Sequence, residues 1–157
     1  MNGTYVLASA SGLTGAFVFF LVLTSVIAAA IYALLTNPKL RHSAYRSWSA
    51  STPVAAGLAS LVWVTVFTAI YLTSLAGFHT IALETDGVTL KYAVPAVTVR
   101  LRHTEIGDVM RQPAHRMQWR LVIYTNIGNR FESAAGSYEA VKTAWEDLER
   151  RRAKPPS

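Results

Sequence analysis

Three arginines and one histidine gather in a short stretch of this sequence. They are Arg111, His115, Arg116 and Arg120, with Met117 and Trp119 between them. A guanidinium group makes planar, bidentate hydrogen bonds to phosphate or carboxylate. The cluster is therefore a candidate site for anionic lipid headgroups or for the acidic surface of a partner protein. The structural alternative is a solvated loop that leads into the wet face of a strand.

Residue patterns that would support catalysis or metal binding are missing from the sequence. Because there is no cysteine, disulfides, thiolate chemistry and cysteine-ligated metals are excluded. The histidines are not spaced as zinc ligands. Glu105 and Asp108 share a helical spacing, but capping and turn roles explain them better than acid–base catalysis does. With no phosphate loop, nucleophile elbow or triad spacing, we predict a protein that is not an enzyme and needs no cofactor or metal.

Two long stretches of the sequence carry no charged side chain and are suited to the interior of a lipid bilayer. Residues 13–35 and 53–77 contain no Lys, Arg, Asp or Glu. Each is long enough at helical rise to cross a hydrocarbon core about 30 Å thick. Neither alternates like a barrel strand, so we predict a transmembrane helical hairpin. The first stretch lacks the basic start and the short apolar run of a signal peptide, so it is predicted to be retained.

The distribution of Lys and Arg predicts the orientation of this hairpin. The loop of residues 36–52 carries Lys39, Arg41 and Arg46, whereas the N-terminal tail, residues 1–12, carries no basic residue. By the positive-inside rule the loop is cytoplasmic, and the soluble domain of this two-pass inner-membrane protein is extracytoplasmic. Basic loops and tails near a membrane also explain the net charge of +6. Nucleic acid is therefore not an expected partner.

The second apolar stretch carries a set of small side chains. These are Ala55, Ala56, Gly57, Ala59 and Ser60. Small residues at spacings of four let another helix approach closely, which is either the first helix of the same chain or a helix of a larger complex. Neither stretch holds His, Asp, Glu, Lys or Arg, which argues against ion transport and against pigment ligation.

The second half of the chain has the alternating pattern of antiparallel strands. Two alternating runs flank Asp86-Gly87, which predicts a β-hairpin, and a third run covers residues 97–101. Residues 104–109 are irregular, which indicates a helical turn or a bulge, a strand near residues 108–111 is predicted to be degenerate, and residues 112–114 are predicted to form a loop.

A further strand and a helix complete the predicted domain. Residues 118–125 alternate as a strand, and residues 126–129 turn the chain into a short strand at 130–133. Ser137 is placed to cap a helix from Tyr138 to about Arg151, with an apolar stripe at intervals of three and four. The domain is expected to cover residues 78–152, and residues 153–157 to form a tail.

These stretches resemble a known kind of protein. Residues 83–90, residues 121–131 and the final helix are similar to bacterial membrane proteins that place a pleckstrin-homology-like (PH-like) domain beside a transmembrane hairpin. The resemblance covers about residues 78–151. It implies a membrane α-helical hairpin plus an α+β domain, in which a small antiparallel PH-like β-barrel or sheet is closed by one C-terminal helix. Family members of this organisation are binding, scaffolding or assembly modules.

Together these observations predict a non-catalytic accessory or assembly subunit of a larger membrane protein complex. The resemblance implies a complex of photosynthetic or respiratory type, with the lipid bilayer and other membrane protein subunits as partners. The hairpin would pack within the membrane, and the PH-like domain would dock through protein–protein interaction. The alternative is a membrane-surface sensor that binds anionic lipid headgroups or a small ligand through its PH-like domain.

Overall fold

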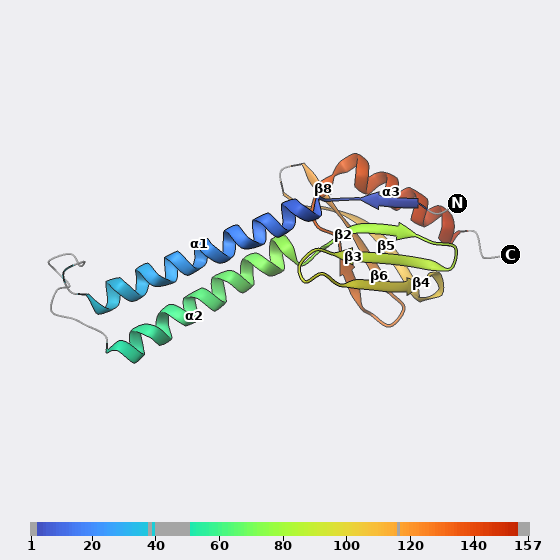
Figure 1. The fold of residues 1–157 in the computed structure, drawn as a ribbon. Helices are drawn as coiled ribbons and strands as arrows, with labels where there is room; N and C mark the ends of the chain where they lie inside the picture. The colour runs from blue at the N-terminus through green and yellow to red at the C-terminus, as the bar shows by residue number, and fades with distance from the viewer. Residues whose placement is uncertain (1–2, 38, 40–50, 116, 154–157) are drawn as a thin grey trace. The chain divides into compact units, whose positions relative to one another are not determined.

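The computed structural model describes residues 3–37, 39, 51–115 and 117–153. The chain divides into two compact units, Ala16–Thr73 and a unit made of Met1–Gly15 with Ser74–Ser157. We call the first unit the hairpin and the second the β domain (Figure 1). The predicted basic residues Arg41, Arg46 and Arg116 lie outside the described residues.

The hairpin is built from the two charge-free stretches. Helix α1 is Ala10–Thr36, and helix α2 is Thr52–Ile70, which continues as a π-helical turn, η3, Tyr71–Leu75. Both are long and apolar enough to cross a membrane, at 27 and 24 residues with mean hydropathies of 2.6 and 1.9. Large apolar side chains on them are exposed, including Phe19 at 61% and Leu61 at 64%. The two predicted helices are confirmed, and lipid is the solvent that suits such a surface.

Aromatic packing joins the helices within the hairpin. Phe17 of α1 meets Phe67 of α2 edge-on, with ring centroids 5.6 Å apart, and Trp63 stacks on Phe67 at 5.5 Å. The indole Nε1 of Trp63 donates a hydrogen bond of 3.2 Å to Ser25 Oγ. The Thr24 hydroxyl donates to a backbone carbonyl of its own helix. These polar side chains are thus satisfied inside the hairpin, as an apolar environment requires.

A short strand precedes the hairpin. Strand β1, Gly3–Val6, pairs antiparallel with strand β2, Phe78–Leu83, which follows the hairpin. Figure 1 shows β1, in dark blue, beside β2. Leu7 continues this segment into the core with 5% exposure. Residues 1–12, predicted to form a tail, therefore include an edge strand of the domain, and the hairpin is an insertion between two neighbouring strands.

The first sheet, sheet A, has the strand order β1-β2-β3-β4. Strand β3 is Gly87–Tyr92 and strand β4 is Thr98–Arg102. The predicted hairpin at Asp86-Gly87 is confirmed, because β3 starts at Gly87 and pairs with β2. A Cβ at Gly87 would lie 2.3 Å from the carbonyl oxygen of Leu101, so β4 can approach only a glycine there.

The second sheet, sheet B, begins after a 3₁₀ turn, η4, His103–Glu105. Its central strand β6 has β5 as one neighbour and β7 as another, while β8 pairs with the start of β6. The strands are β5, Ile106–Pro113; β6, Gln118–Thr125; β7, Arg130–Glu132; and β8, Gly136–Ser137. The prediction of a degenerate strand at 108–111 is wrong, because β5 is continuous there, and of the loop predicted at 112–114 only Ala114 lies outside the strand. A bulge between Ile106 and Asp108 breaks the alternation and hides this strand in the sequence.

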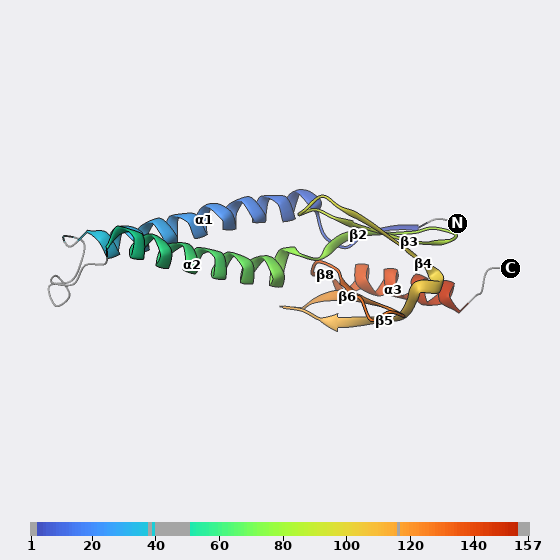
Figure 2. The same ribbon diagram turned by 90° about the horizontal axis from the view of Figure 1, so that it is seen from below.

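Helix α3, Tyr138–Arg152, completes the α+β domain. As predicted, the side chain of Ser137 caps it, accepting a hydrogen bond from the backbone N–H of Ala140. Its buried residues Val141, Ala144 and Leu148 belong to one core with residues of both sheets. Figure 2 shows the two sheets as separate layers. The sheets are not closed into a barrel, although Phe78 and Ser133 form a parallel bridge between them.

The backbone of Gly136, in β8, lies very close to the backbone of Leu7, which follows β1. An added Cβ would lie 2.4 Å from the carbonyl oxygen of Leu7. Because this oxygen belongs to the backbone, the chain itself would have to shift to relieve the clash. We expect Gly136→Ala to lower the free energy of unfolding by about 1–3 kcal/mol. Urea unfolding of the detergent-solubilised chain, followed by tryptophan fluorescence, measures this loss. Gly57→Ala is the matched control, because nothing lies within 4 Å of its Cβ, and equal stability of the two variants would contradict the close approach.

Candidate functional site

Arg111, the first residue of the predicted cluster, packs against aromatic side chains of α3. Its Cζ lies 4.3 Å from the centroid of the Trp145 ring and 5.9 Å from that of Tyr138. The ring of Tyr138 in turn meets Trp119 of β6 edge-on at 5.4 Å. Guanidinium groups stack favourably on aromatic faces, more so when they are partly desolvated. Arg111 therefore helps to hold α3 on sheet B.

A shallow hollow opens beside this stack. It has a volume of about 370 Å³ and is lined by Val109, Met110, Arg111, Trp119, Tyr138 and Trp145. The Arg111 guanidinium has no carboxylate partner among the residues that the structure describes, and its one short polar contact is a 3.5 Å hydrogen bond to the Tyr138 hydroxyl. The hollow thus offers N–H donors beside apolar rings, an arrangement that suits a carboxylate or a phosphate ester. Sequence reasoning placed Trp145 only in the apolar stripe of the helix, because its contact with a strand is not a local feature.

Arg120 lies on the other face of sheet B. In the register of β5 and β6, Arg111 is opposite Leu121 and Gln112 is opposite Arg120. Successive side chains of a strand point to opposite faces, so Arg111 and Arg120 diverge. Arg120 forms an ion pair with Glu132 at 3.4 Å, and Arg130 pairs with the same carboxylate at 2.7 Å. The structure therefore does not bring these two predicted residues into one site.

The middle of the predicted cluster is the turn between β5 and β6. His115 is exposed there, Arg116 lies outside the described residues, and Met117 is 94% exposed with a φ of 64°. The left-handed region is unfavourable for a side chain such as methionine. A long apolar side chain is thus held in solvent at the tip of a β-hairpin.

The small residues of α2 divide into two groups within the hairpin. Ala55 and Ala59 are buried, at 0% and 6% exposure, whereas Ala56, Gly57 and Ser60 are exposed. Ala59, Ala56 and Ser60 also border a hollow of about 410 Å³ between the helices, whose other lining residues are Ser25, Ala28, Ala29, Tyr32 and Trp63. Part of the set therefore packs inside the hairpin, and part leaves a groove open on it.

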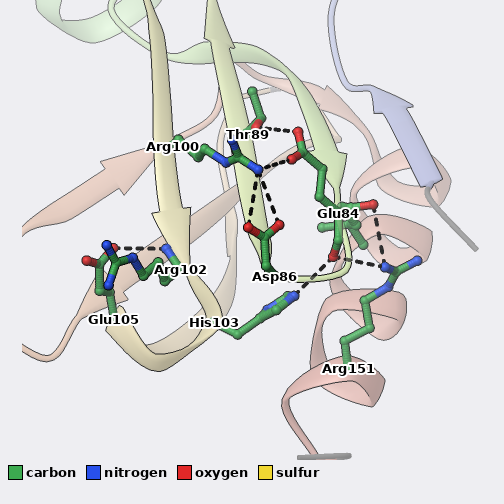
Figure 3. Close-up of polar contacts among 9 residues, drawn as sticks. Glu84, Asp86, Thr89, Arg100, Arg102, His103, Glu105 and Arg151 are labelled. Atoms are coloured by element: carbon green, nitrogen blue, oxygen red, sulfur yellow. Dashed lines mark hydrogen bonds and ion pairs between the residues drawn. The ribbon is translucent and has the colours of Figure 1, made fainter. Parts of the chain in front are cut away.

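The densest polar cluster of the β domain surrounds the turn between β2 and β3 (Figure 3). The Glu84 carboxylate accepts hydrogen bonds from Thr89 Oγ1 at 2.7 Å and from Arg100 Nη2 at 2.6 Å. Arg100 also pairs with Asp86, and the Glu84 carbonyl oxygen accepts hydrogen bonds from His103 Nε2 and Arg151. The cluster fastens the turn to β4 and α3, and exposed pairs of this kind contribute about 0–1 kcal/mol each.

The histidines lie apart in the domain. His79 is at the start of β2 and His103 is at the opposite end of sheet A, in η4. Burial, and then the charge of Lys91, lower the pKa of His79, which keeps its imidazole neutral at pH 7. Within the described ranges, no group of three or more His, Asp or Glu side chains is arranged to hold a metal ion.

Arg111 allows the structural and the ligand-binding interpretations of this site to be separated. If its main role is to hold α3, Arg111→Ala should lower the free energy of unfolding by about 1–2 kcal/mol, through loss of stacking and of stem packing. Arg150→Ala is the control, because this side chain is 70% exposed and should cost less than about 0.5 kcal/mol. Urea unfolding of both variants measures the difference. An Arg111→Ala protein as stable as the control would contradict the structural role.

The region of the predicted cluster thus consists of one stacked arginine beside a hollow, a paired arginine on the opposite face of sheet B, and an exposed tip between them. None of these arrangements is specific to one reaction. No protein-family model matches this chain, and neither a curated protein nor a solved structure does. The chain has two helices that are long and apolar enough to span a membrane, and an antiparallel α+β domain.

Proposed function

We propose that this chain is a non-catalytic accessory or assembly subunit of a larger membrane protein complex, and that a transmembrane helix of the partner packs into the groove on the hairpin. The observation that carries the proposal is the hollow of about 410 Å³ between α1 and α2. Small side chains border it, and small residues are what let two helix backbones approach closely in lipid. A partner helix would fill space that lipid chains fill less well.

The polar groups near the groove are few and already engaged. The indole of Trp63 donates to Ser25, which leaves the groove wall largely apolar. Neither span contains Asp, Glu, His, Lys or Arg, the side chains that usually mark an ion pathway through a membrane. In the β domain the Glu84 and Asp86 carboxylates are tied to Arg100. These features favour a role in binding and assembly over a role in catalysis.

The order of the strands in the β domain supports its assignment as PH-like. The pairing of β1 with β2 supports one orientation of the hairpin in the membrane. Counting β1, one sheet of four strands is followed by strands β5, β6 and β7 and then by a C-terminal helix, which is the order expected of a PH-like domain. The pairing of β1 with β2 supports a two-pass topology in which both outer ends of the hairpin emerge on the same side of the membrane. With the basic loop cytoplasmic, that side is extracytoplasmic in a bacterial inner membrane.

The groove can be tested by filling it with larger side chains. The native complex should be isolated in mild detergent through a tag on the chain, comparing the unchanged protein with Ala56→Leu and Ser60→Leu. We expect a partner to co-purify at fixed stoichiometry with the unchanged chain, and to be reduced several-fold with either variant, because leucine occupies the groove. Quantitative mass spectrometry measures the recovery.

Ala30→Leu is the matched control, because Ala30 is exposed on α1 and does not border the groove. It should retain the partner at the level of the unchanged chain. Repeated isolation of the unchanged chain alone would count against the assembly role, and equal recovery with all variants would place the contact elsewhere than in the groove.

The position of β1 also predicts that the first span is retained in the mature protein. Removal of the first span as a signal peptide would take β1 and Leu7 out of the β domain. Intact mass measurement of the membrane-extracted protein should therefore include residues 3–36. A mature chain that starts after the first span would contradict both the hairpin and the four-stranded sheet.

A further inference from the structure

We propose that the hollow beside Arg111 binds a small organic monocarboxylate, whose carboxylate meets the edge of the guanidinium and whose aromatic or aliphatic body lies among the surrounding rings. The hollow, of about 370 Å³, lies entirely within the β domain, between β5, β6 and α3. Pockets that hold small ligands commonly measure about 300–1,000 Å³. Such a site is additional to the assembly role proposed above and does not depend on a protein partner.

Arg111 lies on the face of sheet B that α3 covers. Side chains two residues apart on a strand share a face, so Arg111 lies on the same face as Val109, which is 5% exposed and belongs to the core. On β6 this face carries Trp119, Leu121 and Ile123. Neither strand places an acidic side chain on it. The guanidinium therefore lies at the margin of a hydrophobic core, without a carboxylate from either strand.

Arg111 differs from the other half-buried arginines that the structure describes. The side chains of Arg120, Arg151 and Arg152 are 27%, 21% and 26% exposed, and each has a carboxylate at 2.7–3.4 Å. Arg111 is half-buried as well, yet among the described residues it has aromatic neighbours and the Tyr138 hydroxyl but no carboxylate within ion-pairing distance. Taking a cation partly out of water is costly unless an anion accompanies it. A bound anion would supply the partner that the fold gives to the other three.

The stack on Trp145 leaves hydrogen-bond donors of Arg111 available. The guanidinium Cζ lies 4.3 Å from the centroid of the Trp145 ring. A guanidinium stacks through its flat face, whereas its five N–H groups point outward in its plane. The 3.5 Å hydrogen bond to the Tyr138 hydroxyl uses one of them. Others can meet the two oxygens of a carboxylate as a bidentate pair, so holding α3 and binding a ligand are compatible roles.

The charges around the hollow favour an anion. Lys142 Nζ lies 6.0 Å from the centroid of the Tyr138 ring, and Arg111 Cζ lies 5.9 Å from the same centroid. Tyr138 begins α3, so the positive end of the helix dipole also borders the hollow. Two carboxylates of α3 oppose this charge: Glu139 in the first turn, and Glu146, which lies 4.0 Å from Lys142. Neither forms an ion pair with Arg111, so the guanidinium is left for a ligand.

The lining of the hollow favours a monocarboxylate over a phosphate. Arg111 is the one charged side chain among the described residues that line it. A single guanidinium matches the two oxygens of one carboxylate, whereas phosphate is commonly held by a run of backbone N–H groups or by several basic side chains. The other lining side chains are apolar or aromatic. An aromatic or aliphatic body attached to the carboxylate would be removed from water against them.

Fluorinated tryptophan makes a direct test possible. Of the four tryptophans, Trp119 and Trp145 line the hollow, whereas Trp63 lies in α2. The full chain is labelled with fluorotryptophan and purified in detergent, and its fluorine NMR resonances are assigned by replacing one tryptophan at a time with phenylalanine. Sodium phenylacetate is then titrated at constant ionic strength. We expect saturable shifts of the resonances of Trp119 and Trp145 but not of Trp63, which controls for uptake of phenylacetate by the detergent.

Two comparisons test the pairing of charges. Phenylacetamide has the same ring without the charge, and it should bind the unchanged chain at least about tenfold more weakly than phenylacetate does. Arg111→Gln should weaken phenylacetate binding by a similar factor. Arg150→Gln is the matched control and should leave binding unchanged, because this arginine of α3 is 70% exposed and does not line the hollow. The comparison of acid and amide needs no variant, so it decides the question even if Arg111→Gln does not fold.

Resonances of Trp119 and Trp145 that stay in place, or that move no more than the resonance of Trp63, would overturn the proposal. So would equal binding of phenylacetate and phenylacetamide, because the hollow would then be an apolar site in which charge has no part. Inorganic phosphate is titrated at the same ionic strength. Tighter binding of phosphate than of phenylacetate would overturn the assignment of the site to a carboxylate.

Discussion

The pairing of β1 with β2 is the constraint on which the rest of this molecule depends. Their hydrogen bonds join residues 3–6 to residues 80–83, with the whole hairpin between them. An edge strand of four residues has little stability alone, so β1 is held by sheet A and by packing: Leu7 enters the core, and the Tyr5 hydroxyl donates to Asp147 of α3 at 2.9 Å. Burial and this carboxylate raise the pKa of Tyr5, so the hydroxyl remains a donor. The two units are thereby joined by two short chain segments rather than one.

Local patterns in the sequence predict the strands 78–83, 87–92 and 118–125 and the capped helix, because each depends on neighbours within a few residues. Three strands were missed or misjudged for physical reasons: β1 and β8 are too short to show a period, and the bulge after Ile106 shifts the alternation of β5. The grouping of Arg111 with Arg120 in one cluster differs from the structure for another reason. Whether Arg111 and Arg120 share a face depends on the parity of the β5–β6 register, which composition and spacing do not reveal.

Side chains of the same chain occupy backbone groups at the outer edge of β5, which affects how the edges of two copies could pair. Trp145 donates to the carbonyl oxygen of Val109 at 3.1 Å, Arg152 donates to that of Gly107 at 2.6 Å, and Asp108 accepts from the N–H of Val109. Proteins anchored in one membrane meet repeatedly in similar orientations, so a bare strand edge would find the same edge on a neighbouring copy far more often than in free solution. Because side chains of the same chain occupy these backbone groups, fewer of them are free to pair with the edge of another strand.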